Sequence, residues 1–445
     1  MAYDYDTVVI GGGPGGLAAA YGLNALQHVA VVENNLWGGT CPNFGCDPKK
    51  ILYGVVEHKR LAQNFRDKGI TSVPEIDWGK MMAFKRSYTD AVPGGTKSGL
   101  QASGIDAIEG SASFADAHTI EVNGRQITAE NFVVATGAYP ARLDIPGKEL
   151  FETSTDFLDQ RQQPNKIAIV GAGYVATELA NIAATAGVTV DLYQHNDRIL
   201  RGYPEKFTKK LVEILRTKGV NFHWNTNVTR LAQADCGVEL TSDQDDDVIY
   251  EHVYTAVGRP ANTAGLKLCA AGVNTDRRGA VQVDEHLRSS APNIYAIGDV
   301  VSTSMPKLTP VASFTGRYVA NAILGDDAPF MMPPVPHTVF AGPELGKVGV
   351  SLDDAAAQPE HFTVNTQQVG SWYTYMRLAD KDAMVATVTD KQSGQLVGAT
   401  VLATNAEELV NYFTEIIADK KPASALGKHI LVYPSTASDL GYFYN

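Results

Sequence analysis

Two cysteines, Cys41 and Cys46, lie five positions apart in the segment GGTCPNFGCDPKK, residues 38–50. In a regular helix, Cα atoms five residues apart are separated by about 8.6 Å, whereas a disulfide requires them to lie within about 7 Å of each other. A bond between these sulfurs therefore requires a distorted turn, which Pro42 and Gly45 permit. A disulfide in such a turn is expected to be easily reduced, as catalytic and regulatory disulfides are.

Two other interpretations of this pair are a metal site and two unrelated buried thiols. A structural zinc site needs two close cysteine pairs, or cysteines together with histidines. The chain has no second close pair, because Cys236 and Cys269 lie alone, and no histidine lies between residues 29 and 57. Inert buried thiols would suit Cys236 and Cys269, but they explain poorly a pair flanked by glycines. We therefore predict a redox-active pair and no metal site.

The first element expected from the N-terminus is a buried strand, residues 7–10, followed by a glycine-rich turn and an alanine-rich helix. A further strand, VAVVE, ends in an acid at roughly the 20-residue spacing at which dinucleotide-binding folds place the group that binds ribose. The glycines let the backbone approach a pyrophosphate, and the helix N-terminus attracts its negative charge. The residues predicted to hold this dinucleotide are Gly11, Gly13, Pro14, Gly16 and Glu33.

The same pattern recurs in the middle of the chain. A strand at residues 166–170 is followed by Gly171-x-Gly173-x-x-Ala176, a helix and a strand at residues 188–193. Two dinucleotide-binding units in one chain suggest one tightly held cofactor and one exchanging cofactor, and flavin with nicotinamide is the common combination. An internal duplication with one inactive site is the alternative.

Several other buried strands are expected to end in turns. NFVVATG ends at Thr136 and Gly137, HVYTAVG ends at Gly258, and APNIYAIGD places Asp299 directly after a strand. The segment KLTPVASFTGRYVANAIL predicts a helix that begins near Thr309.

From about residue 333 the pattern changes to alternating strands with glycine turns, in VPHTVFAGPELGKVGVS, ATVTDKQSGQLVGATVLAT and HILVYPS. The segment NAEELVNYFTEIIADK predicts an amphipathic helix, and MMPPVP, residues 331–336, is the expected boundary. The predicted fold class is therefore α/β, with two Rossmann-like dinucleotide-binding domains and a C-terminal α+β domain.

Length and charge limit the classes of protein that fit. A chain of 445 residues is longer than a single hydrophobic core usually supports, so two or three domains are expected. A formal net charge of -12 argues against a nucleic-acid partner, which requires a basic patch. No apolar run could span a bilayer, no signal peptide opens the chain, and four cysteines are too few for a disulfide-built secreted fold. We expect a cytoplasmic protein without a membrane partner.

The motifs GGGPGG, GGTCxxxxCxPKK, ATG, GAGYVATE, AVGRPAN, AIGD and LTPVA occur in this order and cover nearly the whole chain. In them the sequence resembles the class I pyridine nucleotide-disulfide oxidoreductases, such as glutathione reductase, dihydrolipoyl dehydrogenase and mercuric reductase. The resemblance implies an FAD-binding domain made of residues 1–150 and 265–332, with an NAD(P)-binding domain at residues 151–264. It also implies that the last domain, residues 333–445, is a dimerisation domain that forms a homodimer.

The resemblance further implies how electrons move. NAD(P)H would reduce FAD, FAD would reduce the disulfide, Cys46 would lie against the flavin, and Cys41 would be the outward thiol that meets a small disulfide substrate. Lys49 would pair with Glu178 near the flavin, and Lys50 is the alternative lysine for that pair. The remaining residues implied to bind the cofactors are Gly39, Thr40, Thr136, Gly137, Asp299, Thr309, Gly171, Gly173, Tyr174, Ala176, His195 and Gly258.

Two residues depart from the family pattern at the reacting sulfurs. The family's disulfide reductases carry His-Pro-Thr-x-x-Glu near the C-terminus, whereas LVYPSTASD places Tyr433 at the position of the catalytic histidine. A phenol with a pKa near ~10 is a poor base at neutral pH, although it can donate a hydrogen bond. Asp47 stands where relatives usually carry an apolar residue, and an unpaired carboxylate there would raise a thiol pKa. We expect an outward, solvated Asp47, with Lys50 as the alternative partner.

Other departures concern the substrates. The chain ends in GYFYN without the cysteine pair of mercuric reductases, which disfavours mercury. Glutathione reductases carry an arginine in their first helix, which residues 17–28 lack, although Arg317 matches a second substrate-binding arginine. The segment YQHN lacks the glutamate of NAD enzymes, and Arg198 and Arg201 follow it, so we expect NADPH, with NADH as the alternative.

Three functions remain under consideration from the sequence. The leading one is an NAD(P)H-dependent flavoprotein that reduces a small disulfide through the Cys41–Cys46 pair. The alternative is an NAD(P)H oxidase, or a quinone or metal-ion reductase, in which the pair stores electrons or senses oxidants. The third is a flavin-bound sensor without turnover.

Overall fold

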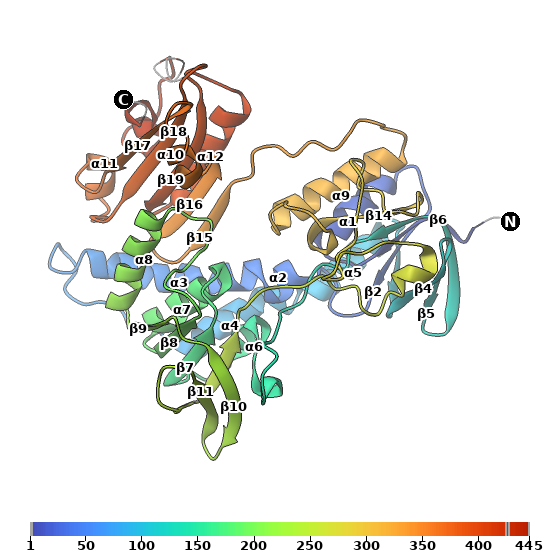
Figure 1. The fold of residues 1–445 in the computed structure, drawn as a ribbon, viewed down its shortest axis with the longest axis horizontal. Helices are drawn as coiled ribbons and strands as arrows, with labels where there is room; N and C mark the ends of the chain where they lie inside the picture. Colours follow the sequence, from blue (N-terminus) through green and yellow to red (C-terminus); the bar gives the residue numbers. More distant parts are fainter. Residues whose placement is uncertain (1–2, 423–424, 426–427, 444–445) are drawn as a thin grey trace. The chain divides into compact units, whose positions relative to one another are not determined.

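The computed structural model describes residues 3–422, 425 and 428–443, and the chain divides into two units that are each assembled from separate segments (Figure 1). The first unit consists of the chain up to residue 49 together with residues 83–141 and 258–331. The second consists of residues 50–82, residues 142–257 and the chain from residue 332.

A largely parallel sheet forms the centre of the first unit, in the order β3-β2-β1-β6-β5-β4, with β14 also paired to β6. The central strands are rich in buried aliphatic residues, as expected for a sheet covered on both faces. Ile10 pairs with Val32 and with Val134, so three parallel strands end at the same edge, where open α/β sheets bind ligands. The strands are β1 (Tyr5–Ile10), β2 (Val29–Glu33), β3 (Asp106–Glu109), β4 (Ala112–Asp116), β5 (Thr119–Val122), β6 (Arg125–Val134) and β14 (Ile294–Ala296).

Two helices of the first unit, α1 (Pro14–Leu23) and α9 (Thr309–Ile323), pack side by side (Figure 1). Small residues allow this approach, because a Cβ atom on Gly316 would lie 2.3 Å from the backbone oxygen of Gly15. Helices α2 (Thr40–Phe44) and α5 (Val92–Ala102) also belong to the first unit, whereas α3 (Cys46–Asn64) and α4 (Trp78–Thr89) each contribute residues to both units.

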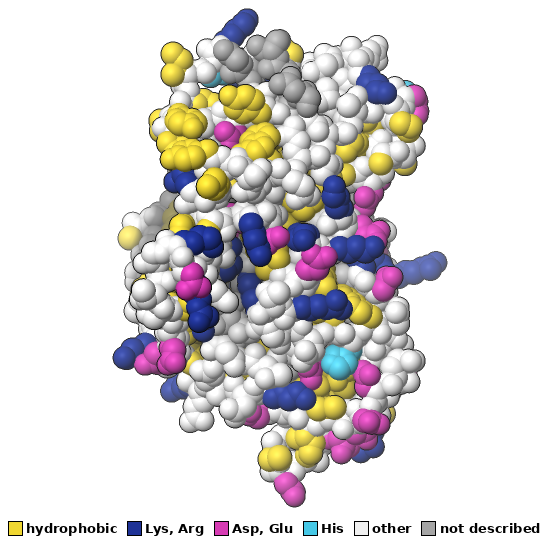
Figure 2. Space-filling model, turned by 90° about the vertical axis from the view of Figure 1, so that its left-hand side faces the viewer, with side chains coloured by type: hydrophobic (Ala, Val, Ile, Leu, Met, Phe, Trp, Pro, Cys, Tyr) yellow, Lys and Arg dark blue, Asp and Glu magenta, His cyan; other side chains and the backbone are white. Residues whose placement is uncertain are grey.

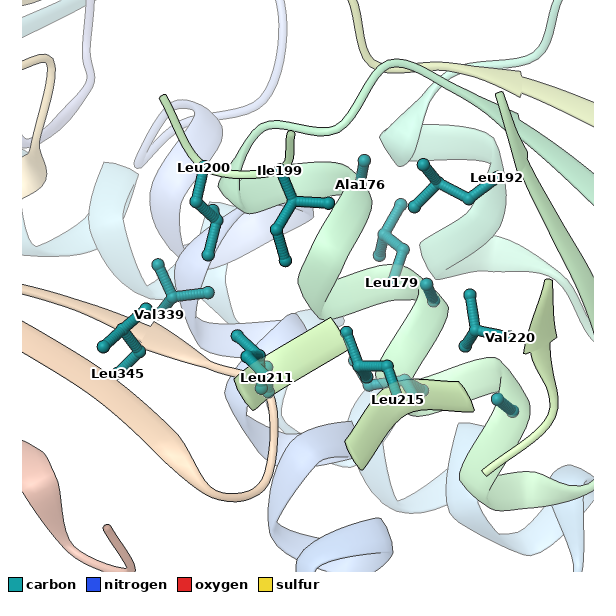
Figure 3. Close-up of a cluster of buried hydrophobic side chains, with 14 of the residues drawn as sticks. Ala176, Leu179, Leu192, Ile199, Leu200, Leu211, Leu215, Val220, Val339 and Leu345 are labelled. Atoms are coloured by element: carbon teal, nitrogen blue, oxygen red, sulfur yellow. The ribbon is translucent and has the colours of Figure 1, made fainter. Parts of the chain in front are cut away.

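A second parallel sheet, in the order β13-β7-β8-β9, lies in the second unit beside a small antiparallel sheet, β10-β11-β12. The strands are β7 (Lys166–Val170), β8 (Thr189–Gln194), β9 (Val220–Trp224), β10 (Val228–Ala234), β11 (Gly237–Ser242), β12 (Val248–Tyr250) and β13 (His252–Thr255). The helices are α6 (Ser154–Asp159), α7 (Tyr174–Ala186) and α8 (Glu205–Thr217). Figure 3 shows how side chains from α7, α8, β8 and β9 meet in one core: Leu179, Leu192, Leu211, Leu215 and Val220.

The C-terminal part of the second unit is an antiparallel sheet in the order β15-β16-β19-β18-β17. Its strands are β15 (His337–Phe340), β16 (Glu344–Gly349), β17 (Phe362–Gln368), β18 (Met384–Asp390) and β19 (Leu396–Ala403). The amphipathic helix α12 (Ala406–Ala418) packs against β16 and β19, and the short helices are α10 (Leu352–Ala356) and α11 (Tyr373–Met376). Side chains of β15 and β16, Val339 and Leu345, join the core drawn in Figure 3.

Most of the expected elements are present, and the predicted α/β class is confirmed. β7 has the predicted bounds, α9 begins at Thr309, and α12 covers most of the predicted amphipathic helix. The strand predicted for HILVYPS is wrong, because residues 429–435 have no regular secondary structure and Ile430 and Val432 are exposed. Among the described residues, none of the helices is both long and apolar enough to cross a membrane.

Candidate active site

The two cysteines lie at the junction between two helices of the first unit. Helix α2 ends at Phe44, Gly45 follows, and α3 begins at Cys46. A Cβ atom on Gly45 would lie 2.7 Å from the backbone oxygen of Thr40, so the close approach of residue 45 to the first turn of α2 requires glycine here. The interruption brings the Cys41 and Cys46 sulfurs within hydrogen-bonding reach of each other. The distorted turn expected from the sequence is therefore present.

The Cys46 thiol lies near the start of α9. Its sulfur is 3.4 Å from the hydroxyl oxygen of Thr309, the first residue of that helix. The positive end of the helix dipole favours negative charge at this place, and the hydroxyl can donate a hydrogen bond to a thiolate. Cys46 is also exposed, whereas Cys41 is half-buried. Cys46 is thus the sulfur suited to carry a negative charge and to contact a bound cofactor.

The Cys41 thiol donates instead to a carboxylate. Its sulfur lies 3.6 Å from Oδ1 of Asp47, and the hydroxyl of Tyr88 donates to Oδ2 of Asp47 over 2.7 Å. Asp47 is therefore half-buried and hydrogen-bonded to Cys41 and Tyr88, not simply solvated as expected, and the alternative pairing with Lys50 stays a prediction. The hydrogen bond with Cys46, burial and the charges of Cys46 and Asp47 raise the pKa of Cys41, and the Thr309 hydroxyl partly opposes this rise.

An ion pair between a half-buried lysine and a buried glutamate lies in the second unit. Lys50 Nζ is 2.8 Å from Oε2 of Glu178, which is almost fully buried, and Nζ also lies 4.1 Å from the ring centre of Phe340. The backbone N–H of Phe340 donates to Oε1 of the same glutamate over 3.0 Å. Lys50, the alternative lysine, is thus paired with Glu178. Lys49 is buried, and its pairing with Glu178 stays a prediction.

The glycine turn after β1 forms an open cradle at the N-terminus of α1. Gly13 precedes the helix and Pro14 is its first residue. A Cβ atom on Gly39 would lie 2.6 Å from the Cα of Gly13, so only glycine permits these two backbones to meet. Glu33 is nine-tenths buried and accepts a 2.7 Å hydrogen bond from the Gly12 N–H.

The first unit also contains polar atoms that a dinucleotide could satisfy. Within the described residues, the buried Oγ1 of Thr136 and Oδ1 of Asn43 have no hydrogen-bond partner. Burial raises the pKa of the Asp299 carboxyl, and the charges of Lys307 and Arg259 act in the opposite direction. A glycine cradle, a buried acid and orphaned polar atoms in one unit fit FAD.

A similar cradle follows β7 in the second unit. Gly171 has a positive φ of 107°, Gly173 precedes α7, and Ala176 is buried in the helix. Tyr174 packs edge-on against His337, with their ring centres 5.8 Å apart. A helix N-terminus without a side-chain cap leaves backbone N–H groups for a pyrophosphate, so this cradle fits a nicotinamide dinucleotide.

The side chains at and after the end of β8 are the candidates for binding the ribose of that dinucleotide. Gln194 is buried and donates to Asn196, whereas His195 is exposed. Arg198 donates to the backbone oxygen of Tyr203 and lies 3.5 Å from Asp353, so it is already bound within the protein.

The remaining predicted residues lie as follows. Gly11, Gly137 and Gly258 have positive φ in the turns that follow β1, β6 and β13, Gly16 lies in α1, and Thr40 begins α2. Tyr433 is exposed and stacks on Tyr373, with ring centres 6.1 Å apart. Figure 2 shows hydrophobic side chains gathered in the upper part of the view. Large hydrophobic side chains that are exposed in the C-terminal domain include Met376, Ile430, Val432, Tyr433 and Tyr442.

Sequence reasoning missed two contacts around the sulfurs, one with Cys46 itself and one with Asp47 beside Cys41. Tyr88 lies 41 positions beyond Asp47 on α4 and belongs to no motif, so no local signal could identify it. Thr309 was expected only as a cofactor ligand, and its contact with Cys46 depends on a sequence separation of 263 positions.

Comparison with known proteins identifies the family. Residues 5–316 match the family described as Pyridine nucleotide-disulphide oxidoreductase, and residues 335–441 match the dimerisation domain of the same family. The chain belongs to this family. As a member it is a flavoprotein disulfide oxidoreductase whose cofactors are FAD and NAD(P)H, and its dimerisation domain indicates a homodimer.

Several relatives cover almost the entire oxidoreductase. It is 32% identical to a dihydrolipoyl dehydrogenase of Halobacterium salinarum over 91% of this chain and 88% of that protein. It is 30% identical to a glutathione reductase of Burkholderia cepacia over 98% of both chains. The structure is similar to that of the HOCl-induced flavoprotein disulfide reductase RclA from Escherichia coli, with a TM-score of 0.89, 26% identity and 99% of each chain covered.

Proposed function

We propose that this oxidoreductase transfers two electrons from NAD(P)H to the Cys41–Cys46 pair and then to a small disulfide compound. The observation that carries the proposal is the contact between these two sulfurs at the junction of α2 and α3. FAD, when bound, supplies the two-electron relay between the nicotinamide and the cysteine pair. The overall reaction is NAD(P)H + H⁺ + R–S–S–R → NAD(P)⁺ + 2 R–SH.

The two cysteines have different roles in this reaction. The Cys41 thiolate attacks one sulfur of the substrate, which breaks the substrate S–S bond and releases the first thiolate. Cys46 then attacks Cys41, forms the Cys41–Cys46 disulfide and releases the second thiolate. Each released thiolate takes up a proton from solvent. The position of Cys46 beside Thr309 supports its role as the sulfur that contacts the cofactor.

Other residues bind and orient the cofactors in this proposal. Residues 1–150 and 265–332 bind FAD, with Glu33 at the adenosine ribose and Asp299 at the ribityl chain. Residues 151–264 bind the nicotinamide nucleotide, which Tyr174 covers. Residues 333–445 form the homodimer, in which Tyr433 meets the reacting site of the partner subunit. The protein acts in the cytoplasm.

NADPH is the proposed nicotinamide cofactor. The end of β8 carries no glutamate for the ribose hydroxyls, and His195 and Arg201 are exposed after it. Arg198 is bound to Tyr203 and Asp353, which leaves His195 and Arg201 as the candidates for the 2′-phosphate.

A second candidate, reduction of a metal ion or quinone, is supported by Tyr433, which replaces the histidine of the disulfide reductases. A structure described as a Cu(II) complex of a cysteine-to-serine mutant of RclA is also similar to this chain, with a TM-score of 0.90 and 25% identity.

A panel of electron acceptors tests the proposed function. The purified protein is reduced with NADPH without oxygen and then offered small disulfides, a quinone, oxygen and Cu(II) separately. We expect one disulfide to be consumed with two thiols formed per NADPH, and Cys41→Ser to slow this turnover at least about a hundredfold. Cys236→Ser, which changes a lone exposed cysteine, is the matched control and is expected to turn over normally. Quinone, oxygen or Cu(II) turnover that survives Cys41→Ser, with no disulfide consumed by the original protein, would contradict the proposal.

A further inference from the structure

The carboxylate of Asp47 and the phenol of Tyr88 form a hydrogen-bonded chain with the Cys41 thiol. The Cys41 thiol donates to Oδ1 of Asp47 over 3.6 Å, and the Tyr88 hydroxyl donates to Oδ2 over 2.7 Å. Asp47 is half-buried at the first turn of α3, directly after the second cysteine. All three side chains belong to the first unit.

The groups that face the Cys41 thiol come from three elements. Cys46 and Asp47 lie on α3, and the hydroxyl of Thr309 lies on α9. Tyr88, on α4, reaches the thiol through Asp47. Helix α5 packs near α2, but its lysine, Lys97, is paired with Glu109 at 2.6 Å.

We propose that Asp47, held in place by Tyr88, is a positioning residue that keeps a proton on Cys41 in the reduced enzyme. The proposal rests on the function proposed above and adds a regulation of it. Attack by Cys41 on a disulfide is then slow at neutral pH and becomes faster as the pH rises.

Hydrogen bonding and charge both act in this direction. An S–H group that donates to a carboxylate is stabilised as the thiol, and the negative charge of the carboxylate disfavours a nearby thiolate. The raised pKa of Cys41 agrees with this arrangement, with Cys46 and burial as the larger causes. The hydrogen bond to Asp47 is also the main cause that raises the pKa of Tyr88 to about 12, so the phenol keeps the proton that it donates to Asp47.

The protons of the reaction balance in this arrangement. Before attack, the Cys41 thiol releases its proton to solvent hydroxide, and the resulting thiolate breaks the substrate S–S bond. The released substrate thiolate takes up a proton from water. The Asp47 carboxyl group neither gains nor loses a proton in these steps, so it sets the fraction of reactive thiolate and does not act as the base.

Alkylation of Cys41 measures this fraction directly. The protein with its FAD is reduced with dithiothreitol and exposed to short pulses of iodoacetamide from about pH 6 to about pH 10, because only the thiolate reacts. Fragmentation of the labelled peptide in a mass spectrometer distinguishes Cys41 from Cys46. We expect Asp47→Asn to lower the apparent pKa of Cys41 by about one unit and to raise its alkylation rate near pH 7 about tenfold.

Further variants separate charge from position. Asp47→Val, which restores an apolar residue, is expected to shift the pH profile at least as far as Asp47→Asn. Tyr88→Phe keeps the carboxylate but removes its anchor, so we expect a smaller shift in the same direction. Asp90→Asn removes an exposed charge near the end of the same helix as Tyr88 and is expected to leave the profile unchanged.

The outcomes are distinct. An Asp47→Asn protein that retains its FAD but has an unchanged or higher apparent pKa for Cys41 would overturn the inference, and so would a full shift in Asp90→Asn. If Asp47→Asn loses FAD, the apparent pKa of Cys41 is measured in Tyr88→Phe instead, and an unchanged or higher value there would overturn the inference. Alkylation needs no electron acceptor, so this result is independent of whether the protein reduces a disulfide. A failure of the proposed function is seen only with the acceptor panel.

Discussion

Cys41 and Cys46 contact each other and both lie near the Thr309 hydroxyl, but Cys41 also donates to the Asp47 carboxylate. Cys46 lies beside a hydroxyl at the start of α9, and Cys41 lies beside a carboxylate at the start of α3. A helix N-terminus favours a thiolate, whereas a carboxylate disfavours one. The reduced pair is therefore expected to hold its negative charge on Cys46 and its proton on Cys41. The Asp47 carboxylate, which accepts from the Cys41 thiol, is therefore expected to give the two neighbouring sulfurs different thiol pKa values.

The Lys50–Glu178 pair is the second residue-scale feature of the site. We expect Lys50→Met to lower the free energy of unfolding of the second unit by about 2 kcal/mol, because it leaves a buried carboxylate without this cation. The double variant Lys50→Met/Glu178→Gln is expected to recover part of the loss, since an uncharged amide can still accept from the Phe340 N–H. Urea denaturation followed by circular dichroism measures the effect.

The control for this pair is an exposed one of the same chemistry. Lys80 pairs with Asp77 at 3.4 Å on the surface of α4, and its side chain is 87% exposed. Exposed ion pairs contribute about 0–1 kcal/mol. Lys80→Met should therefore leave the denaturation midpoint nearly unchanged. An equal effect of the two lysine substitutions would contradict the view that burial gives the Lys50 pair its importance.

At the scale of elements, the contact between α1 and α9 positions the site. Helix α1 starts at the first dinucleotide cradle, and α9 starts at Thr309, whose hydroxyl contacts the Cys46 sulfur. The positions of both helix N-termini therefore depend on the packing of α1 against α9. We expect Gly316→Ala to destabilise the first unit by about 3 kcal/mol and to reduce the FAD retained per chain, because its Cβ would overlap the backbone of Gly15. Urea denaturation and the absorbance of bound FAD measure the two effects.

A glycine in open space provides the comparison. Gly94 lies in α5, and a Cβ atom there would meet nothing within 4 Å. Gly94→Ala should be neutral or stabilising by up to about 1 kcal/mol, because alanine has the higher helix propensity. A similar loss of FAD in both alanine variants would contradict the packing argument.

The sequence predicted best those elements whose residues carry a local pattern. β7 and the start of α9 were predicted from a buried apolar run and from Thr309-Pro310 at a helix start. The HILVYPS strand failed because alternating apolar residues also suit a surface that another subunit covers. The Asp47–Tyr88 contact was not predictable, since it joins α3 to α4 and follows from tertiary packing.

At the scale of the whole molecule, the C-terminal domain leaves many apolar side chains exposed. Ile430 is fully exposed, Val432 is 80% exposed and Tyr433 is 71% exposed, and these residues lie in the segment that matches the dimerisation domain. Clustered exposed apolar residues usually mark an interface. The same segment carries Tyr433, which the resemblance to the family predicts at the position of its catalytic histidine, so formation of the dimer and the chemistry of Cys41 are expected to be linked.

Ile430→Asp tests this link. The side chain is fully exposed, so the substitution should not disturb the fold of one chain, but it would bury an unpaired charge in the dimer. We expect a dimer dissociation constant raised at least about a hundredfold, measured by analytical ultracentrifugation, together with a loss of disulfide turnover at concentrations where the variant is monomeric. Met331→Asp, at a position that is 81% exposed and outside the dimerisation match, is expected to leave the protein dimeric and active. A dimer of unchanged strength in Ile430→Asp would place the interface elsewhere, and a fully active monomer would show that Tyr433 takes no part in turnover.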